Sequence, residues 1–142
     1  MNHPTLRFLV RDLQRLRALA TTLAGHIVAG STGADDELDA FAEALRMRVR
    51  LEEELIFACV ERFVDAPFAP TLDLRREHRM LLALLAAVED DLALGRRGAA
   101  AGLLRHLETE LAAHGRKEAE VLHPLVDRLL DRAPAPVADR VA

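Results

Sequence analysis

Histidine and glutamate side chains occur at positions where a helical protein is expected to carry apolar residues. His114 and Glu118 lie four residues apart, so a helix would place an imidazole and a carboxylate one turn apart on one face. Glu52 and His78 take equivalent places in two other segments, and Arg48 precedes Glu52 by one turn. Burying such groups is costly unless each finds a partner or a metal. These five residues therefore predict either a metal site or a buried polar cluster.

Four segments of the chain each carry one continuous stripe of mainly apolar residues at spacings of three and four, which is typical of a helix with one inward face. The five polar residues interrupt these stripes, so we expect them to converge on one buried layer. The predicted stripes are Leu6, Leu9, Leu13, Leu16, Ala20, Leu23 and Ile27; Leu38, Phe41, Leu45, Arg48, Glu52, Leu55 and Cys59; Leu74, His78, Leu81, Leu85, Val88 and Leu92; and Leu104, Leu107, Leu111, His114, Glu118, Val121 and Leu125.

The segments have clear boundaries. Glycines and prolines separate them, and Thr32 and Thr71 are predicted to cap the second and third helices. Short connections between long helices favour an all-α, antiparallel up-down-up-down four-helix bundle in residues 1–133, followed by a flexible Pro/Ala-rich tail in residues 134–142. The predicted helices run from about Pro4 to Ala29, from the Gly30–Gly33 loop to about Val64, from Thr71 to about Leu94, and from Ala99 to about Leu130 with a kink near Pro124.

The composition excludes several classes of function. A net charge of −4 with scattered arginines argues against nucleic acid, and no apolar run is long enough to span a membrane. The N-terminus lacks the apolar core of a signal peptide, so we expect a cytoplasmic protein. The single Cys59 is expected to be a small buried hydrophobe. The other histidines are expected to be ordinary surface or boundary residues: His3, His26, His106 and His123.

The sequence also contains an internal repeat. Residues 10–16 resemble residues 75–81, and residues 48–58 resemble residues 114–124. The offset is 65 residues from Leu13 to His78 and 66 residues from Arg48 to His114 and from Glu52 to Glu118. The repeat predicts two helical hairpins packed about a pseudo-twofold axis, with the ligand-like set in the second half.

From about Leu6 to Leu130 the chain resembles the hemerythrin family, the HHE cation-binding domains. The resemblance rests on the segments Glu52–Ala58, Arg75–Arg79 and His114–Pro124. It implies a four-helix bundle around two irons, which are bridged by two carboxylates and otherwise held by five histidines. Such proteins bind dioxygen or serve in related sensing and storage roles.

The resemblance assigns roles to individual residues. Glu52 and Glu118 match the bridging carboxylates, and His78 and His114 match two of the three histidines on one iron. The remaining histidine positions are occupied by Leu13, Arg48 and Leu74. The chain is therefore expected to hold at most one iron or other divalent metal.

Several functions remain open at this stage. The resemblance implies a small metal- or oxygen-linked binding or sensing protein with a reduced site, for which dioxygen is a candidate ligand. The alternative is a metal-free interaction module, in which Arg48 bridges Glu52 and Glu118 instead of swinging toward the bundle end. A two-metal site with unusual ligands, haem bound by a histidine, and a protein partner or homo-oligomer also remain open. No nucleophile or cofactor motif is evident, so no catalytic residue is assigned.

Overall fold

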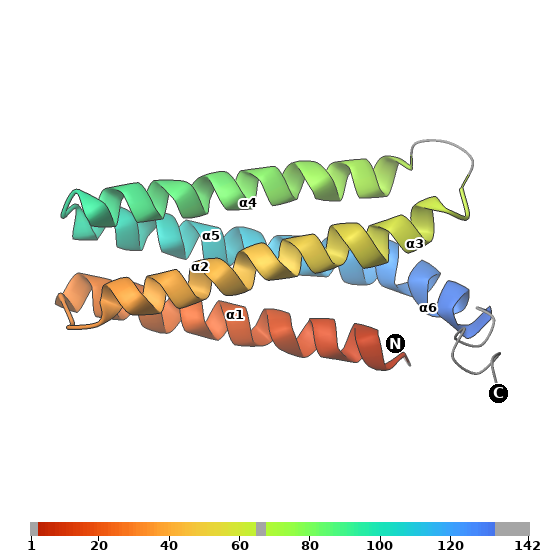
Figure 1. The fold of residues 1–142 in the computed structure, drawn as a ribbon, viewed down its shortest axis with the longest axis horizontal. Helices are drawn as coiled ribbons and strands as arrows, with labels where there is room; N and C mark the ends of the chain where they lie inside the picture. The colour runs from red at the N-terminus through yellow and green to blue at the C-terminus, as the bar shows by residue number, and fades with distance from the viewer. Residues whose placement is uncertain (1–2, 65–67, 133–142) are drawn as a thin grey trace, which may run out of the picture.

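The computed structural model describes residues 3–64 and 68–132, and within them the chain forms four antiparallel helical rods and no strand (Figure 1). The predicted all-α bundle is confirmed. The first rod is α1 (Pro4–Ala29), and the second joins α2 (Ala34–Leu51), the π-helical turn η1 (Glu52–Phe57) and α3 (Ala58–Glu61). The third rod is α4 (Ala69–Ala93), and the fourth joins α5 (Arg97–Lys117), the π-helical turn η2 (Glu118–Leu122) and α6 (His123–Arg132).

The two predicted threonine caps are wrong. Helix α2 starts after Gly33, whose φ of 91° is readily adopted only by glycine, and no side chain caps it. Helix α4 starts at Ala69, because Pro70 is tolerated in the first turn of a helix. Thr71 therefore lies inside the helix, where its hydroxyl donates to the Phe68 carbonyl over 3.0 Å.

Two apolar clusters fill the bundle, one on each side of the polar residues. The larger cluster comprises buried apolar residues of four helices, between Leu16 and Ile27 in α1, Ala34 and Leu45 in α2, Leu81 and Val88 in α4, and Ala100 and Leu111 in α5. The smaller cluster lies where α1 begins and α6 ends, and it comprises Leu6, Leu9, Ile56, Phe57, Val60, Leu74, Leu122 and Val126. Along each of the last three rods, the polar residues fall between members of the two clusters.

The two π-helical turns change which residues face inward. Each turn contains one extra residue, which rotates the following helix relative to an unbroken α-helix. After Glu52 the buried side chains are Ile56, Phe57 and Val60, and after Glu118 they are Leu122, His123 and Val126. Our prediction for these segments was wrong by one residue: Leu55 and Val121 are exposed, and Cys59 and Leu125 are only half-buried. The irregularity predicted at Pro124 takes the form of η2, immediately before it.

Helices α1 and α5 approach each other closely at Gly115. A Cβ atom at this position would lie 2.1 Å from Cδ2 of Leu13, so a side chain here would require the end of Leu13 to move. Leu13 is only half-buried, although the sequence predicts it on the inward stripe.

Two further expectations concern the tail and the membrane. The predicted flexible tail at residues 134–142 lies outside the described residues. Within residues 3–64 and 68–132, no helix combines the length and apolar character needed to cross a membrane.

Candidate metal centre

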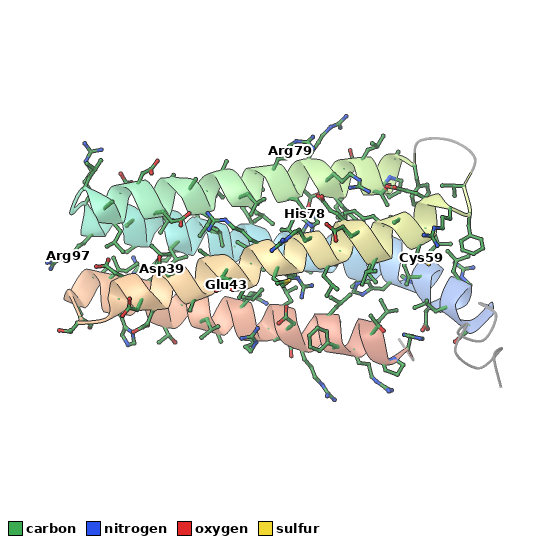
Figure 2. All side chains as sticks on the ribbon, viewed as in Figure 1. Asp39, Glu43, Cys59, His78, Arg79 and Arg97 are labelled. Atoms are coloured by element: carbon green, nitrogen blue, oxygen red, sulfur yellow. The ribbon has the colours of Figure 1, made fainter. Side chains whose placement is uncertain are left out.

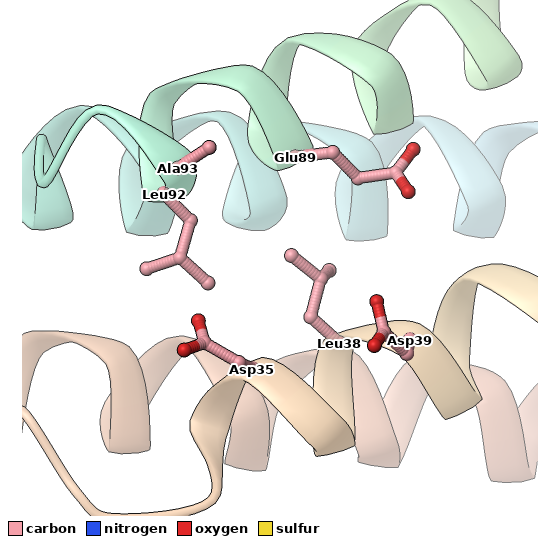
Figure 3. A pocket seen from close by; sticks show the side chains of 6 residues that line it. All are labelled: Asp35, Leu38, Asp39, Glu89, Leu92 and Ala93. Carbon is pink, nitrogen blue, oxygen red and sulfur yellow. The ribbon is translucent and has the colours of Figure 1, made fainter.

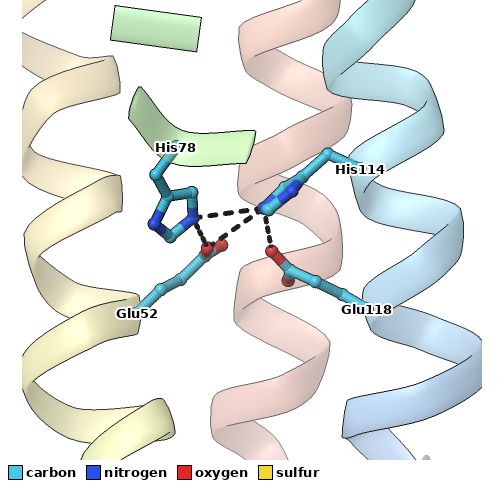
Figure 4. Close-up of side chains that lie close together, drawn as sticks. All are labelled: Glu52, His78, His114 and Glu118. Carbon is cyan, nitrogen blue, oxygen red and sulfur yellow. Dashed lines mark hydrogen bonds and ion pairs between the residues drawn. The ribbon is translucent and has the colours of Figure 1, made fainter. Parts of the chain in front are cut away.

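Four side chains from three rods meet in the buried layer between the two apolar clusters (Figure 4). Glu52, His78, His114 and Glu118 are each at least 98% buried. His78 Nε2 lies 2.8 Å from Glu52 Oε2 and 3.2 Å from His114 Nε2. His114 Nε2 lies 3.5 Å from Glu52 Oε2 and also contacts Glu118 Oε1. The structure thus brings together the four residues that the sequence predicts as ligands.

The four donor atoms lie close enough together to surround one metal ion after small shifts of the side chains. Donor atoms that each lie about 2.1 Å from one ion are separated by about 3.0–3.4 Å, whether the geometry is octahedral or tetrahedral. All four donors here lie within 4.8 Å of one another, and the two imidazole nitrogens are 3.2 Å apart. Two imidazoles and two carboxylates suit iron, zinc or manganese. The residues present therefore fit a single divalent metal.

Each imidazole is also held from its outer side by a carboxylate. His78 Nδ1 lies 2.8 Å from Glu53 Oε1, and His114 Nδ1 lies 3.3 Å from Glu77 Oε1. Metal-binding histidines usually have such a partner, because it fixes the tautomer and turns the other nitrogen toward the metal. Glu77 is itself held by Lys117, whose ammonium donates over 2.7 Å.

Neither outer carboxylate was predicted from the sequence. Glu53 directly follows the predicted ligand Glu52, and it is half-buried and contacts His78. Glu77 directly precedes His78, and it reaches the other histidine, His114, across the helix interface. The sequence does show an acidic residue beside Glu52 and another beside His78. It does not show toward which histidine these side chains point.

The His78 ring has one more support, from Phe57 in η1. The two rings stack with centroids 5.3 Å apart and planes 9° apart. The Arg75 guanidinium lies 5.3 Å from the centroid of Phe57. Figure 2 shows the contrast with the next residue: Arg79 points away from the bundle, whereas His78 is directed into it. The π-helical turn thus supplies both a ligand, Glu52, and the aromatic wall behind a second ligand.

Arg48 lies against the opposite side of the two carboxylates. Its Nε is 2.9 Å from Glu52 Oε1, and its Nη2 is 4.0 Å from Glu118 Oε2. The same guanidinium donates through Nη1 to the Leu9 carbonyl over 2.7 Å and to Asp12 Oδ2 over 3.1 Å. Each buried carboxylate therefore presents one oxygen to the histidines and the other to Arg48. Of the two positions left open for Arg48, the structure shows the one between the two carboxylates, with the closer contact to Glu52.

The buried charges alter the pKa values of two members of the cluster. Burial alone lowers the pKa of His114, but its interactions with Glu118 and Glu52 outweigh burial and raise this pKa from 6.5 to about 10. Burial likewise raises the pKa of Glu52, yet His114, His78 and the charge of Arg48 together hold it well below its ordinary value. At neutral pH the cluster without metal therefore contains an imidazolium and an ionised carboxylate.

His123 is the main correction among the remaining histidines. It was expected at the surface or boundary, but only 3% of it is exposed. Its Nε2 lies 3.5 Å from Glu118 Oε2, and neither ring nitrogen makes a hydrogen bond. The extra residue in η2 rotates this side chain inward. The repeat offers a signal, since the offset of 66 residues places His123 at the position of buried Phe57.

The other three histidines lie where they were expected. His106 is exposed, and His26 is half-buried and pairs with Glu37 at 2.8 Å. His3 is half-buried and caps α1 by accepting from the Thr5 amide over 3.2 Å. None of them approaches the four predicted ligands.

Two cavities are relevant to the location of a site. One, of about 240 Å³, opens between α1 and α5 and reaches Arg48, Glu118 and His123. The other, of about 370 Å³, lies between the start of α2 and the end of α4 (Figure 3). Its walls include the carboxylates of Asp35, Asp39 and Glu89 and contain no histidine or cysteine. The second cavity therefore has no connection with the predicted ligands.

Fold and site together define an all-α four-helix protein with a buried histidine–glutamate cluster that could hold one metal ion. No family model, curated protein or solved structure matches the chain. A functional conclusion must therefore come from the site itself.

Proposed function

We propose that this protein is a hemerythrin-like metal protein with a reduced site, in which Glu52, His78, His114 and Glu118 hold one divalent metal. The observation that carries the proposal is the orientation of both imidazoles. Each directs Nε2 into the cluster and engages an outer carboxylate through Nδ1. A core histidine that served only packing would not require this two-sided arrangement.

Iron is the metal favoured by the sequence resemblance, and bound iron would supply reversible dioxygen binding or redox sensing. Arg48 limits the site to one ion, because its guanidinium already neutralises the second oxygen of each carboxylate. The role proposed is therefore metal- or oxygen-linked binding or sensing, not catalysis of a chemical step. Within the described residues the site has no activated nucleophile beside it.

One observation favours a second candidate, a metal-free helical interaction module. Arg48 and the protonated His114 place positive charge beside the two buried carboxylates, so the cluster has cationic partners without any metal. In this alternative the chain keeps the fold and uses the buried ion pairs only for structure. The two candidates differ in whether purified protein takes up metal at the cluster.

Anaerobic loading with iron(II) followed by elemental analysis distinguishes them. We expect one iron per chain and a visible absorption change on exposure to air. The variants His78→Ala and His114→Ala should each lose the iron. His106→Ala is a matched control, because His106 and Glu110 repeat the His-x-x-x-Glu spacing on α5 but His106 is exposed. Iron-free wild-type protein, or iron that persists in both site variants, would favour the interaction module.

A further inference from the structure

The cavity between α1 and α5 has the features of a ligand pocket. It encloses about 240 Å³, and Val10, Leu13, Ala112 and Ala119 supply apolar walls. Since a water molecule occupies about 30 Å³, there is room for a ligand of roughly eight non-hydrogen atoms. Ala119 is exposed at the surface, so the pocket is open to solvent.

The inner end of this pocket contains polar groups without adequate partners. His123 is 97% buried, and neither of its ring nitrogens makes a hydrogen bond, although Nε2 lies 3.5 Å from Glu118 Oε2. Arg48 also lines the pocket, and its Nη2 lies 4.0 Å from Glu118 Oε2. An imidazole keeps at least one N–H donor, and a buried donor without a partner is unfavourable. A ligand that accepts hydrogen bonds would satisfy both groups.

The internal repeat explains why the space beside His123 is open, whereas the equivalent space beside Phe57 is filled. Phe57 occupies the position equivalent to His123, and it lies between His78 and the Arg75 guanidinium. In the first half, Val10 stands where the repeat has Arg75. The shorter side chain leaves the space beside His123 uncovered, and this space is the pocket.

The charges around the pocket favour an anion. Arg17, Arg48 and Arg116 line it, against the single carboxylate of Glu118. Arg17 is paired with Glu108 over 2.8 Å, whereas exposed Arg116 has no ion pair within the described part of the chain. Glu118 contacts His114 and Arg48 and lies 3.5 Å from His123, so cationic and imidazole groups surround its carboxylate.

We propose that this pocket binds a small organic monocarboxylate with an apolar body. The carboxylate accepts hydrogen bonds from His123 and from Arg48 Nη2, and the body lies against Val10, Leu13 and Ala119. Arg116 at the rim attracts the anion. This inference goes beyond the proposed metal-linked function, because protein groups alone form the site and no metal is needed to fill it.

Titration with pentanoate, followed by backbone amide NMR signals, tests the proposal. We expect shifts confined to residues 10–17 and 112–123, in metal-free and in zinc-loaded protein alike. Pentanoate should bind at least about tenfold more tightly than pentanamide, which has the same shape without the charge. Pentylammonium should not bind.

Two variants test the residues that bind pentanoate, and a third variant is the control. His123→Leu should weaken pentanoate at least about tenfold, and Arg116→Gln should weaken it about threefold, since Arg116 acts only at the rim. Arg79→Gln is the control, because Arg79 is exposed on α4, away from the pocket (Figure 2). Should His123→Leu fail to fold, Arg116→Gln still tests the site.

Three results would overturn the proposal. Equal affinity for pentanoate and pentanamide would mean that the pocket recognises only apolar shape. Unchanged affinity in both His123→Leu and Arg116→Gln would place the anion elsewhere. Binding seen only in zinc-loaded protein would mean that the carboxylate coordinates the metal instead. Iron loading is measured separately, so a failed pocket leaves the proposed metal site untouched.

Discussion

At the residue scale, Arg48 and Asp12 occupy the positions in the first half of the repeat that His114 and its outer carboxylate, Glu77, occupy in the second half. The repeat relates Arg48 to His114 and Asp12 to Glu77. In the second half Glu77 contacts the His114 ring, and in the first half Asp12 contacts the Arg48 guanidinium. The same framework therefore positions an imidazole on one side of the carboxylates and a permanent cation on the other. This arrangement is the physical reason for expecting no more than one metal.

Removing Arg48 should expose how much the cluster depends on its charge. Arg48→Ala in metal-free protein is expected to reduce the free energy of unfolding by about 3–5 kcal/mol, because Glu52 and Glu118 would lose their buried partner. Added zinc should reduce this loss, since it binds only the folded protein. The measurement is chemical denaturation with and without zinc.

The matched control is Arg46→Ala on the same helix. Arg46 pairs with Glu89 at 2.6 Å, but nearly half of the Arg46 side chain is exposed. Loss of such a surface pair should cost less than about 1 kcal/mol. An Arg48→Ala variant as stable as Arg46→Ala would show that Arg48 is not the charge partner of the two carboxylates.

The pKa changes predict how the stability of the metal-free protein depends on pH. His114 has a pKa of about 10 when folded and an ordinary value of 6.5, so its stabilising effect is complete below about pH 6.5 and is lost as pH rises toward 10. Glu52 has a lowered pKa, so its contribution is present above its ordinary value of 4.5 and is lost in acid. Maximum stability is expected between these values.

Urea denaturation across this pH range measures the effect. The decline from pH 6.5 to 10 should be much smaller in His114→Gln, which cannot carry the proton. His26→Gln serves as the control, because His26 has an exposed carboxylate partner, Glu37. An identical alkaline decline in wild type and His114→Gln would contradict the assignment.

At the scale of elements, the two π-helical turns determine which side chains surround the carboxylates of the site. Each turn begins at a carboxylate of the cluster, Glu52 or Glu118, and each directs the residue five positions later inward. That residue is Phe57 in one half and His123 in the other. Such turns are intrinsically less stable than α-helix and are often found at functional sites.

Deleting Leu55 should convert η1 into ordinary α-helix. Leu55 is 59% exposed, and its removal would put Ile56, Phe57 and Val60 at the inward α-helical spacings of three, four and seven after Glu52. We expect the fold and its thermal midpoint to be retained, while metal affinity falls at least about tenfold because the support of His78 changes. Zinc titration and thermal unfolding give both values.

Deletion of Ala86 is the control for that experiment. Ala86 is also exposed, but it lies within the regular helix α4, so its loss would rotate one side of the apolar cluster out of register. This variant should unfold or lose most of its stability. If the Leu55 deletion proved equally damaging, the π-helical turn would be required for folding and not specifically for the site.

The sequence predicts the elements well where the helices are regular. The third stripe, from Leu74 to Val88, is buried as expected, and the helix bounds of α1 agree with the prediction. The prediction fails after Glu52 and Glu118, because α-helical spacing was continued through two π-helical turns. The four ligand positions precede the extra residues or lie at their start, so they were placed correctly, whereas His123 follows one and was not.

At the scale of the whole molecule, the polar layer divides the bundle into two apolar cores. Neither core surrounds the cluster alone, so the four ligands are held by packing on both sides. Leu74 belongs to the smaller core, and Leu13 packs against the larger one. These two leucines and Arg48 occupy the positions where the family resemblance would place further histidines.

Replacing all three should restore a larger site. The combined variant Leu13→His, Arg48→His and Leu74→His is expected to raise iron content from one toward two per chain, since it supplies imidazoles and removes the competing guanidinium. Gly115 is left unchanged in this variant, because it lies directly against position 13. Elemental analysis of folded protein is the readout, with Leu74→His alone as the control. Iron content that stays at one would mean that the framework no longer accommodates a second ion.

Calorimetric titration with zinc at pH 7, performed in two buffers with different ionisation enthalpies, tests the central claim most directly. Zinc must displace the proton that the raised pKa of His114 retains at this pH. The account predicts one zinc per chain, with about one proton released on binding. Absence of binding or two ions per chain would contradict a single metal centre built on Glu52, His78, His114 and Glu118. Binding without proton release would contradict the raised pKa of His114.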